Sequence, residues 1–106
     1  VGGVIIRERK VLSEDGLFSI IFTISQSKAA QIVEPQVVSR GFIYMKDSEA
    51  LTKNFISKAK SFLDLELAKQ NIDYNAIKSS LTDYLNKIIY EQTDRKPIVL
   101  PVFMMV

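Results

Sequence analysis

The stretch LFSIIFTIS, residues 17–25, decides the fold class of this sequence. Hydrophobic side chains recur there with a period of two, which is typical of a strand with one buried face. The apolar positions that share this face are Phe18, Ile20, Phe22 and Ile24. The opposite face mixes polar and apolar side chains, so we do not expect it to be plainly solvated. A half-buried strand is therefore predicted, and other segments of the chain must supply the strands that pair with it.

The segments on either side of this strand predict two more strands. A second strand is expected at residues 36–44, after Pro35, and the short polar segment 26–30 suits a connection between antiparallel neighbours. Gly41 inside that strand indicates a bulge or a close approach of two backbones. A further short strand is expected at residues 4–6, which are Val, Ile and Ile.

The hydrophobic period changes to that of a helix after residue 46. One helix is expected from Asp47, as its N-cap, to about residue 69. A second begins after Asp73 and ends near Thr93, because Pro97 lacks an amide proton and disfavours helical geometry before it. The second helix has the clearest apolar stripe of the sequence, made of Ile77, Leu81, Tyr84, Leu85 and Ile88.

The last segment, residues 98–106, is apolar at every position and predicts a strand. Pro101 cannot donate to a ladder, which restricts this strand to a sheet edge, a strand start or a bulge. An edge strand that is apolar on both faces favours association unless something covers it. Two interpretations stay open: other parts of the protein cover the strand, or it forms a self-association or interdomain surface.

The order strand, strand, strand, helix, helix, strand predicts an α+β fold. Two amphipathic helices need one apolar sheet face, so we expect a two-layer sandwich with a small three- to four-stranded sheet covered on one face by two helices. The chain has 106 residues, no internal repeat and no Gly/Ser linker, so residues 1–106 are expected to form a single domain.

The composition limits the chemistry available to this chain. It contains no Cys and no His, which excludes a disulfide framework, a Ser-His-Asp triad, a Cys-His pair and the usual zinc sites. Neighbouring carboxylates are better explained as turns, caps and solvated helix faces, although the sequence does not exclude a Mg²⁺ site. No run of 18 apolar residues occurs, so we expect no membrane partner. We predict no catalytic and no metal-ligating residue here.

Basic residues beside an aromatic one suggest a second kind of surface. Arg40 stands two positions from Phe42 on a predicted strand, so the two side chains would share a face that could contact phosphate and stack a base. Arg95 and Lys96 form another basic point after the second helix. These four residues are the candidate RNA-binding set. The net charge of +2 adds little support, and the alternative is that Phe42 is core while Arg40 closes a local ion pair.

Three stretches carry a resemblance to a known family: VIIRERKVLSEDG at residues 4–16, VVSRGFIYM at residues 37–45 and YEQTDRKPIVLPV at residues 90–102. They resemble segments of the C-terminal domain of bacterial ribonuclease J, in the same order and across essentially the whole chain. The resemblance implies a cytoplasmic nuclease of the metallo-β-lactamase and β-CASP family. Such an enzyme processes and degrades RNA from its 5′ end and also cuts internally.

The resemblance also implies what this chain lacks. Zinc is expected in a missing catalytic domain, where it would activate the attacking water. Residues 1–16 are expected to be a connecting segment after a missing β-CASP domain, and the chain itself an excised part of the longer protein. The expected partners are a second copy or a paralogous ribonuclease J subunit, with RNA reached through the parent enzyme.

Two function hypotheses follow for this domain. In the first it is a non-catalytic module for oligomer assembly and domain docking, with Pro101, Phe103 and Met105 as candidate interface residues. In the second it is an accessory RNA-binding module that guides RNA to the catalytic domains. The first rests on the apolar final strand, and the second rests on a small basic set.

Overall fold

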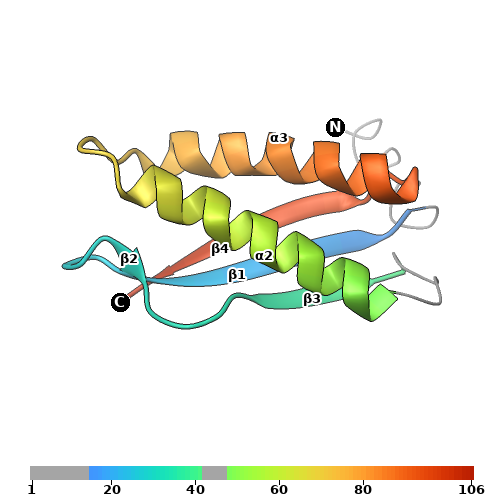
Figure 1. Ribbon diagram of the computed structural model, residues 1–106, viewed down its shortest axis with the longest axis horizontal. Helices are drawn as coiled ribbons and strands as arrows, with labels where there is room; N and C mark the ends of the chain where they lie inside the picture. The colour runs from blue at the N-terminus through green and yellow to red at the C-terminus, as the bar shows by residue number, and fades with distance from the viewer. Residues whose placement is uncertain (1–14, 42–47) are drawn as a thin grey trace, which may run out of the picture.

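The fold is a sheet of four strands with two helices packed on it (Figure 1). A computed structural model describes residues 15–41 and 48–106. The elements in chain order are β1 (Leu17–Ser25), β2 (Ala30–Gln31), β3 (Gln36–Arg40), α2 (Ser48–Leu67), α3 (Tyr74–Thr93) and β4 (Ile98–Met105). The predicted strand at residues 4–6, the predicted N-cap Asp47 and most of the expected connecting segment lie outside the described residues.

β1 is the central strand of a mixed sheet. β4 pairs with it in parallel from Leu17 to Ile24, so β4 occupies one whole edge. On the other edge, β3 pairs antiparallel with the first half of β1, and β2 pairs antiparallel with its end. The predicted antiparallel connection after β1 is therefore confirmed. The parallel pairing of β4 follows from the two-helix crossover that precedes it.

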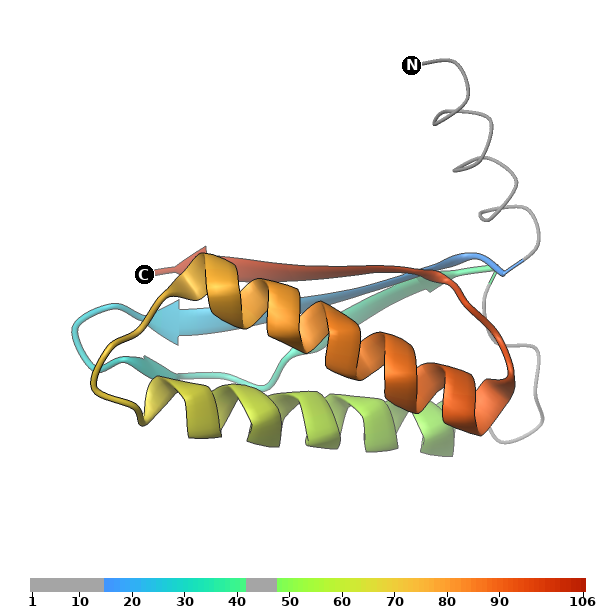
Figure 2. The same cartoon turned by 90° about the horizontal axis from the view of Figure 1, so that it is seen from above.

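The two helices lie on the same side of the sheet. Figure 2 shows α2 and α3 as one layer and the strands as a second layer. Among the described residues, no helix covers the other face of the sheet. The predicted α+β two-layer sandwich is confirmed.

The core forms where the inner face of β1 meets the two helices. Its four alternating side chains are fully buried, as the period of two predicts. The ring of Phe18 meets that of Phe55 on α2 edge to face, with centroids 6.0 Å apart. Burial of a side chain of this size stabilises a fold by roughly 1.5–3 kcal/mol. The helix residues buried with them are Phe55, Ala59, Leu63, Leu67, Ile77, Leu81, Leu85, Ile88 and Ile89.

Both predicted ends of α3 are confirmed. The Asp73 carboxylate accepts hydrogen bonds from the backbone N–H groups of Asn75 at 3.1 Å and Ala76 at 3.2 Å. These contacts satisfy donors that the first helical turn leaves unpaired. At the other end, Asp94 adopts a left-handed conformation with φ 60°, and its N–H donates to the Tyr90 carbonyl at 2.8 Å. The helix stops there, three residues before Pro97.

The second predicted strand is described only as far as residue 41. β3 spans Gln36–Arg40, and Gly41 follows it with φ +62°, so a bulge inside the predicted strand stays a prediction. The predicted close approach of two backbones is confirmed, because a Cβ placed on Gly16 would lie 2.3 Å from the Arg40 carbonyl oxygen and 2.5 Å from the Gly41 carbonyl carbon. Residues 42–44 lie outside the described residues.

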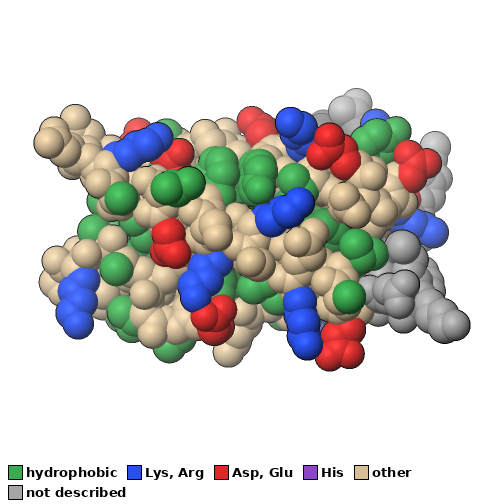
Figure 3. All heavy atoms as spheres, viewed as in Figure 1, with side chains coloured by type: hydrophobic (Ala, Val, Ile, Leu, Met, Phe, Trp, Pro, Cys, Tyr) green, Lys and Arg blue, Asp and Glu red, His purple; other side chains and the backbone are tan. Residues whose placement is uncertain are grey.

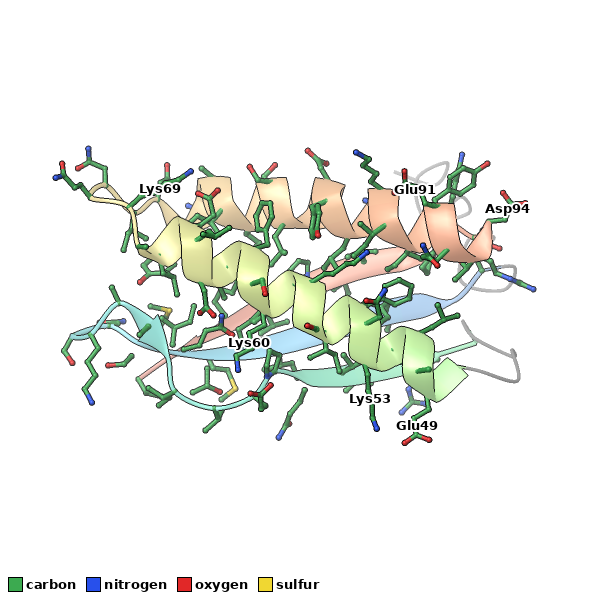
Figure 4. All side chains as sticks on the ribbon, viewed as in Figure 1. Glu49, Lys53, Lys60, Lys69, Glu91 and Asp94 are labelled. Atoms are coloured by element: carbon green, nitrogen blue, oxygen red, sulfur yellow. The ribbon has the colours of Figure 1, made fainter. Side chains whose placement is uncertain are left out.

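β2 was not predicted, and polar contacts with α2 hold it in place. The Gln31 side-chain amide donates to the Lys60 carbonyl oxygen at 3.1 Å and to Asp64 Oδ1 at 2.9 Å. The Lys60 ammonium donates to the Glu34 carboxylate in the β2–β3 connection (Figure 4). This hydrogen bond raises the pKa of Lys60 above its ordinary value. A contact between segments distant in the sequence therefore defines this strand.

Replacing Leu81 or Leu85 by Ala should lower the free energy of unfolding by about 2–5 kcal/mol, because each change truncates a fully buried side chain. Urea denaturation measures the loss. The matched control is Leu65→Ala, whose side chain is 71% exposed and which should stay within about 0.5 kcal/mol of the parent. Equal midpoints for the core and control variants would contradict the assignment of the buried helix face.

Candidate functional site

The face of the sheet opposite the helices, called the open face below, is the first candidate surface. Paired residues of neighbouring strands point to the same face, so the strand register identifies its members. They are Leu17, Ser19, Ile21, Thr23, Gln36, Val38, Arg40, Ile98, Leu100, Val102 and Met104. The most exposed apolar side chains among them are Val38 at 44%, Leu100 at 48%, Val102 at 39% and Met104 at 53%.

The open face differs in charge from the helix side of the molecule. Arg40 is the one charged side chain among its members, and none of them is acidic. On the helix side, acidic and basic side chains are interspersed over α2 and α3 (Figure 3). The cores of protein–protein interfaces are depleted in charged residues. The composition of the open face is therefore typical of a surface that another protein layer covers.

The predicted interface residues of β4 point the other way. Pro101 is buried, and the Phe103 ring lies edge to face with those of Phe22 at 5.8 Å and Tyr74 at 6.1 Å. Phe103 and Met105 also line a surface hollow of about 460 Å³ beside the start of α3. Whether these three side chains take part in an interface stays a prediction.

The exposed side chains of β4 are Leu100, Val102 and Met104, which sequence reasoning missed. Every position of this strand is apolar, so hydrophobic alternation carried no information about which side faces the core. Pro101 had restricted β4 to a sheet edge, a strand start or a bulge, which does not say which face of the strand is exposed. Among the described strands β4 pairs with β1 alone, which is the edge position of these three.

Three of the four candidate RNA-binding residues lie at one end of the sheet. Arg40 pairs with Leu17, and Leu17 pairs on its other side with Ile98. Arg95 and Lys96 belong to the turn that leads into Ile98, so the fold brings both predicted basic points to this end. They come from segments more than fifty residues apart in the sequence, which periodicity alone could not relate.

Arg95 and Lys96 are tied to their surroundings. The Lys96 backbone N–H donates to Asp15 Oδ2 at 3.1 Å, and Arg95 Nη1 lies 3.9 Å from Asp15 Oδ1. The Lys96 ammonium lies 5.0 Å from the centroid of the Tyr90 ring, within the range of a cation–π contact. The Asp15 carboxylate therefore holds the turn between α3 and β4, and the two cations contribute to that structure.

Arg40 stands apart from this arrangement. It is exposed at the end of the open face, and no carboxylate of residues 15–41 and 48–106 lies within ion-pairing distance of it. The alternative of a local ion pair is therefore not found in that part of the chain. Phe42, the aromatic candidate beside it, lies outside the described residues.

No ligand set for a metal ion appears in the part of the chain that the structure describes, since no three acidic, His or Cys side chains come together there. Of the two helices described, neither is both long enough and apolar enough to cross a membrane. The two candidate surfaces described above are the open face and the basic end that adjoins it at Arg40.

Comparison with known proteins identifies the family. The family described as ribonuclease J C-terminal domain matches residues 4–106. The chain belongs to this family. The predicted resemblance is confirmed over nearly the whole sequence. The architecture described above is therefore that of a ribonuclease J C-terminal domain.

Three relatives show the extent of the similarity. The chain is 30% identical over 104 residues to ribonuclease J2 of Bacillus subtilis, covering 98% of this chain and 19% of the relative. It is 34% identical over 102 residues to ribonuclease J 2 of Staphylococcus saprophyticus, covering 96% and 18%. It is 37% identical over 104 residues to ribonuclease J 2 of Streptococcus pyogenes, covering 98% and 19%. The chain spans less than a fifth of the length of these relatives.

In this ribonuclease J C-terminal domain, Gly16→Ala should lower the free energy of unfolding by more than about 1 kcal/mol, because φ is +83° and a Cβ would meet the backbone of Arg40 and Gly41. Thermal melting measures the effect. Ser39→Ala on the exposed edge of β3 is the control and should leave the melting temperature nearly unchanged. A Gly16→Ala protein as stable as the parent would contradict the close contact at the basic end.

Proposed function

We propose that this domain is a non-catalytic module for assembly and docking in a longer nuclease, and that the open face is its contact surface. One observation carries the proposal: three strands present a face with exposed aliphatic side chains and no carboxylate. A side-by-side parallel pair such as β1 and β4 is usually covered on both faces in proteins. The helices cover one face, which leaves the open face for a partner.

The favoured occupant is a second ribonuclease J chain, either an identical copy or a paralogous subunit. The exposed side chains are Leu, Val and Met, which suit contact with another aliphatic protein surface. Stacking of nucleic-acid bases would call for aromatic side chains, and the open face as defined above has none. Its composition therefore favours protein over RNA.

The wider proposal concerns the longer protein. The relatives are named ribonucleases, which supports a parent enzyme that acts on RNA. The resemblance described above implies that this parent processes and degrades RNA in the cytoplasm and has metallo-β-lactamase and β-CASP domains. Zinc would belong to that catalytic part, because this chain has no His and no Cys to bind it. The residues of this chain would then contribute association and positioning, and RNA would be bound by the parent enzyme.

Val102→Glu should shift the chain from self-associated species toward monomer, because it places a carboxylate on the open face, midway along β4. Light scattering over a wide concentration range measures the change. Leu65→Glu is the matched control, since it makes the same kind of change at an exposed position of α2 and should leave the association unchanged.

A parent chain that is monomeric at all concentrations would contradict self-association through the open face. Equal dissociation by Val102→Glu and Leu65→Glu would assign the effect to net charge rather than to this surface. Melting curves of both variants establish that they are folded. Phe103 is a poorer probe, because its ring packs in the core and a charged substitution there would destabilise the fold.

The second candidate function, RNA guidance, is favoured by the convergence of Arg40, Arg95 and Lys96 at one end of the sheet. Under the assembly proposal, changing all three to Gln in the full-length enzyme should leave RNA affinity within about twofold, because two of the cations are already held by Asp15 and Tyr90. Filter binding at several salt concentrations measures the affinity. A loss of about one unit of salt slope for each removed cation would instead support the RNA-guiding function.

A further inference from the structure

The outer edge of β4 has a defined hydrogen-bonding pattern. The Ile98 N–H donates to the Gly16 carbonyl at 2.9 Å, and the Val106 N–H donates to the Ile24 carbonyl at 2.9 Å. In a parallel ladder the residues that bond to one neighbour alternate along the strand. The even-numbered residues of β4 therefore direct their backbone polar groups toward β1. The odd-numbered residues direct theirs to the outer edge, and they are Val99, Pro101, Phe103 and Met105.

An edge of this kind favours strand addition. β4 is eight residues long, apolar throughout, and pairs with β1 alone among the described strands. Long apolar edges are templates on which another copy can extend the sheet. Charged side chains, which commonly protect edges, are absent from β4. Another feature of the strand must then limit edge pairing.

Pro101 lies among the residues whose backbone faces outward. Its side chain is buried on the helix side of the sheet. Because the even-numbered residues of β4 bond to β1, the ring nitrogen of Pro101, which carries Cδ in place of a hydrogen, faces the outer edge. The ladder between β1 and β4 loses no hydrogen bond at Pro101, because the backbone nitrogen of residue 101 does not face β1. An incoming strand would meet a missing donor and a methylene group near the middle of the edge.

We propose that Pro101 blocks addition of a second copy along the outer edge of β4, so that copies form closed assemblies of limited size and not open-ended chains. Edge-to-edge addition of an apolar strand can continue from copy to copy, whereas a two-fold contact closes on itself. The block at the edge follows from the backbone geometry alone. The assignment of the remaining contact to the open face rests on the proposed function above.

The test is Pro101→Val in the chain, which keeps a compact apolar side chain in the core and restores the N–H at the edge. We expect species larger than those of the parent, growing with concentration in light scattering. In these species the amides of residues 103 and 105 should exchange with solvent at least about tenfold more slowly than in the parent, and the new amide of residue 101 should be protected with them. Val99→Ala is the control, because it truncates another buried side chain of β4 and adds no donor. It should form no larger species.

A Pro101→Val chain with the mass profile of the parent and unprotected edge amides would overturn the proposal. If Val does not fit the core and the variant fails to melt cooperatively, Pro101→Ala restores the same donor with a smaller side chain and is judged by the same criteria. The double variant Pro101→Val, Val102→Glu separates the two proposals. Large species with protected edge amides in the double variant support the edge block, whatever becomes of association through the open face. If Pro101→Val alone forms the large species and the double variant does not, pairing through the edge is overturned.

Discussion

Burial of one face of β1 is the interaction on which the rest of the structure depends. Phe18, Ile20, Phe22 and Ile24 have no exposed surface, and side chains from α2, α3 and β4 pack around them. At roughly 1.5–3 kcal/mol for each buried side chain, this row is comparable to the whole net stability of a small domain. The positions of both helices follow from it, because each must turn its apolar stripe toward the same strand.

The two helices cover one face of the sheet, and the composition of the opposite face has a separate explanation. The chain contains two helices in its described residues, and both lie on the side of the buried row (Figure 2). The outer side of those helices has the mixed charges of a solvated surface, whereas the open face has aliphatic side chains and Arg40. In the described residues one face of the sheet is packed against the helices and no helix covers the other, which is the basis of the proposed function.

The two ends of the sheet have different roles in this arrangement. At the end near Arg40, the carboxylate of Asp15 and the carbonyl oxygen of Gly16 hold the turn into β4. Residues from three separate parts of the sequence meet there, namely Asp15 and Gly16, Arg40 and Gly41, and Lys96 and Ile98. Because Arg95 and Lys96 contribute to this turn, their positive charge is explained in part by structure, and only Arg40 extends the open face with a charge that no described carboxylate neutralises.

The sequence by itself determined the fold class, the buried face of β1, both ends of α3 and the restriction of β4 to an edge, a strand start or a bulge, since each depends on local periodicity or on the covalent geometry of proline. It did not determine β2, which depends on contacts of Gln31 with α2. It also could not say which side of β4 is exposed. In a strand that is apolar at every position, register against β1 makes that choice, and register exists only in the tertiary structure.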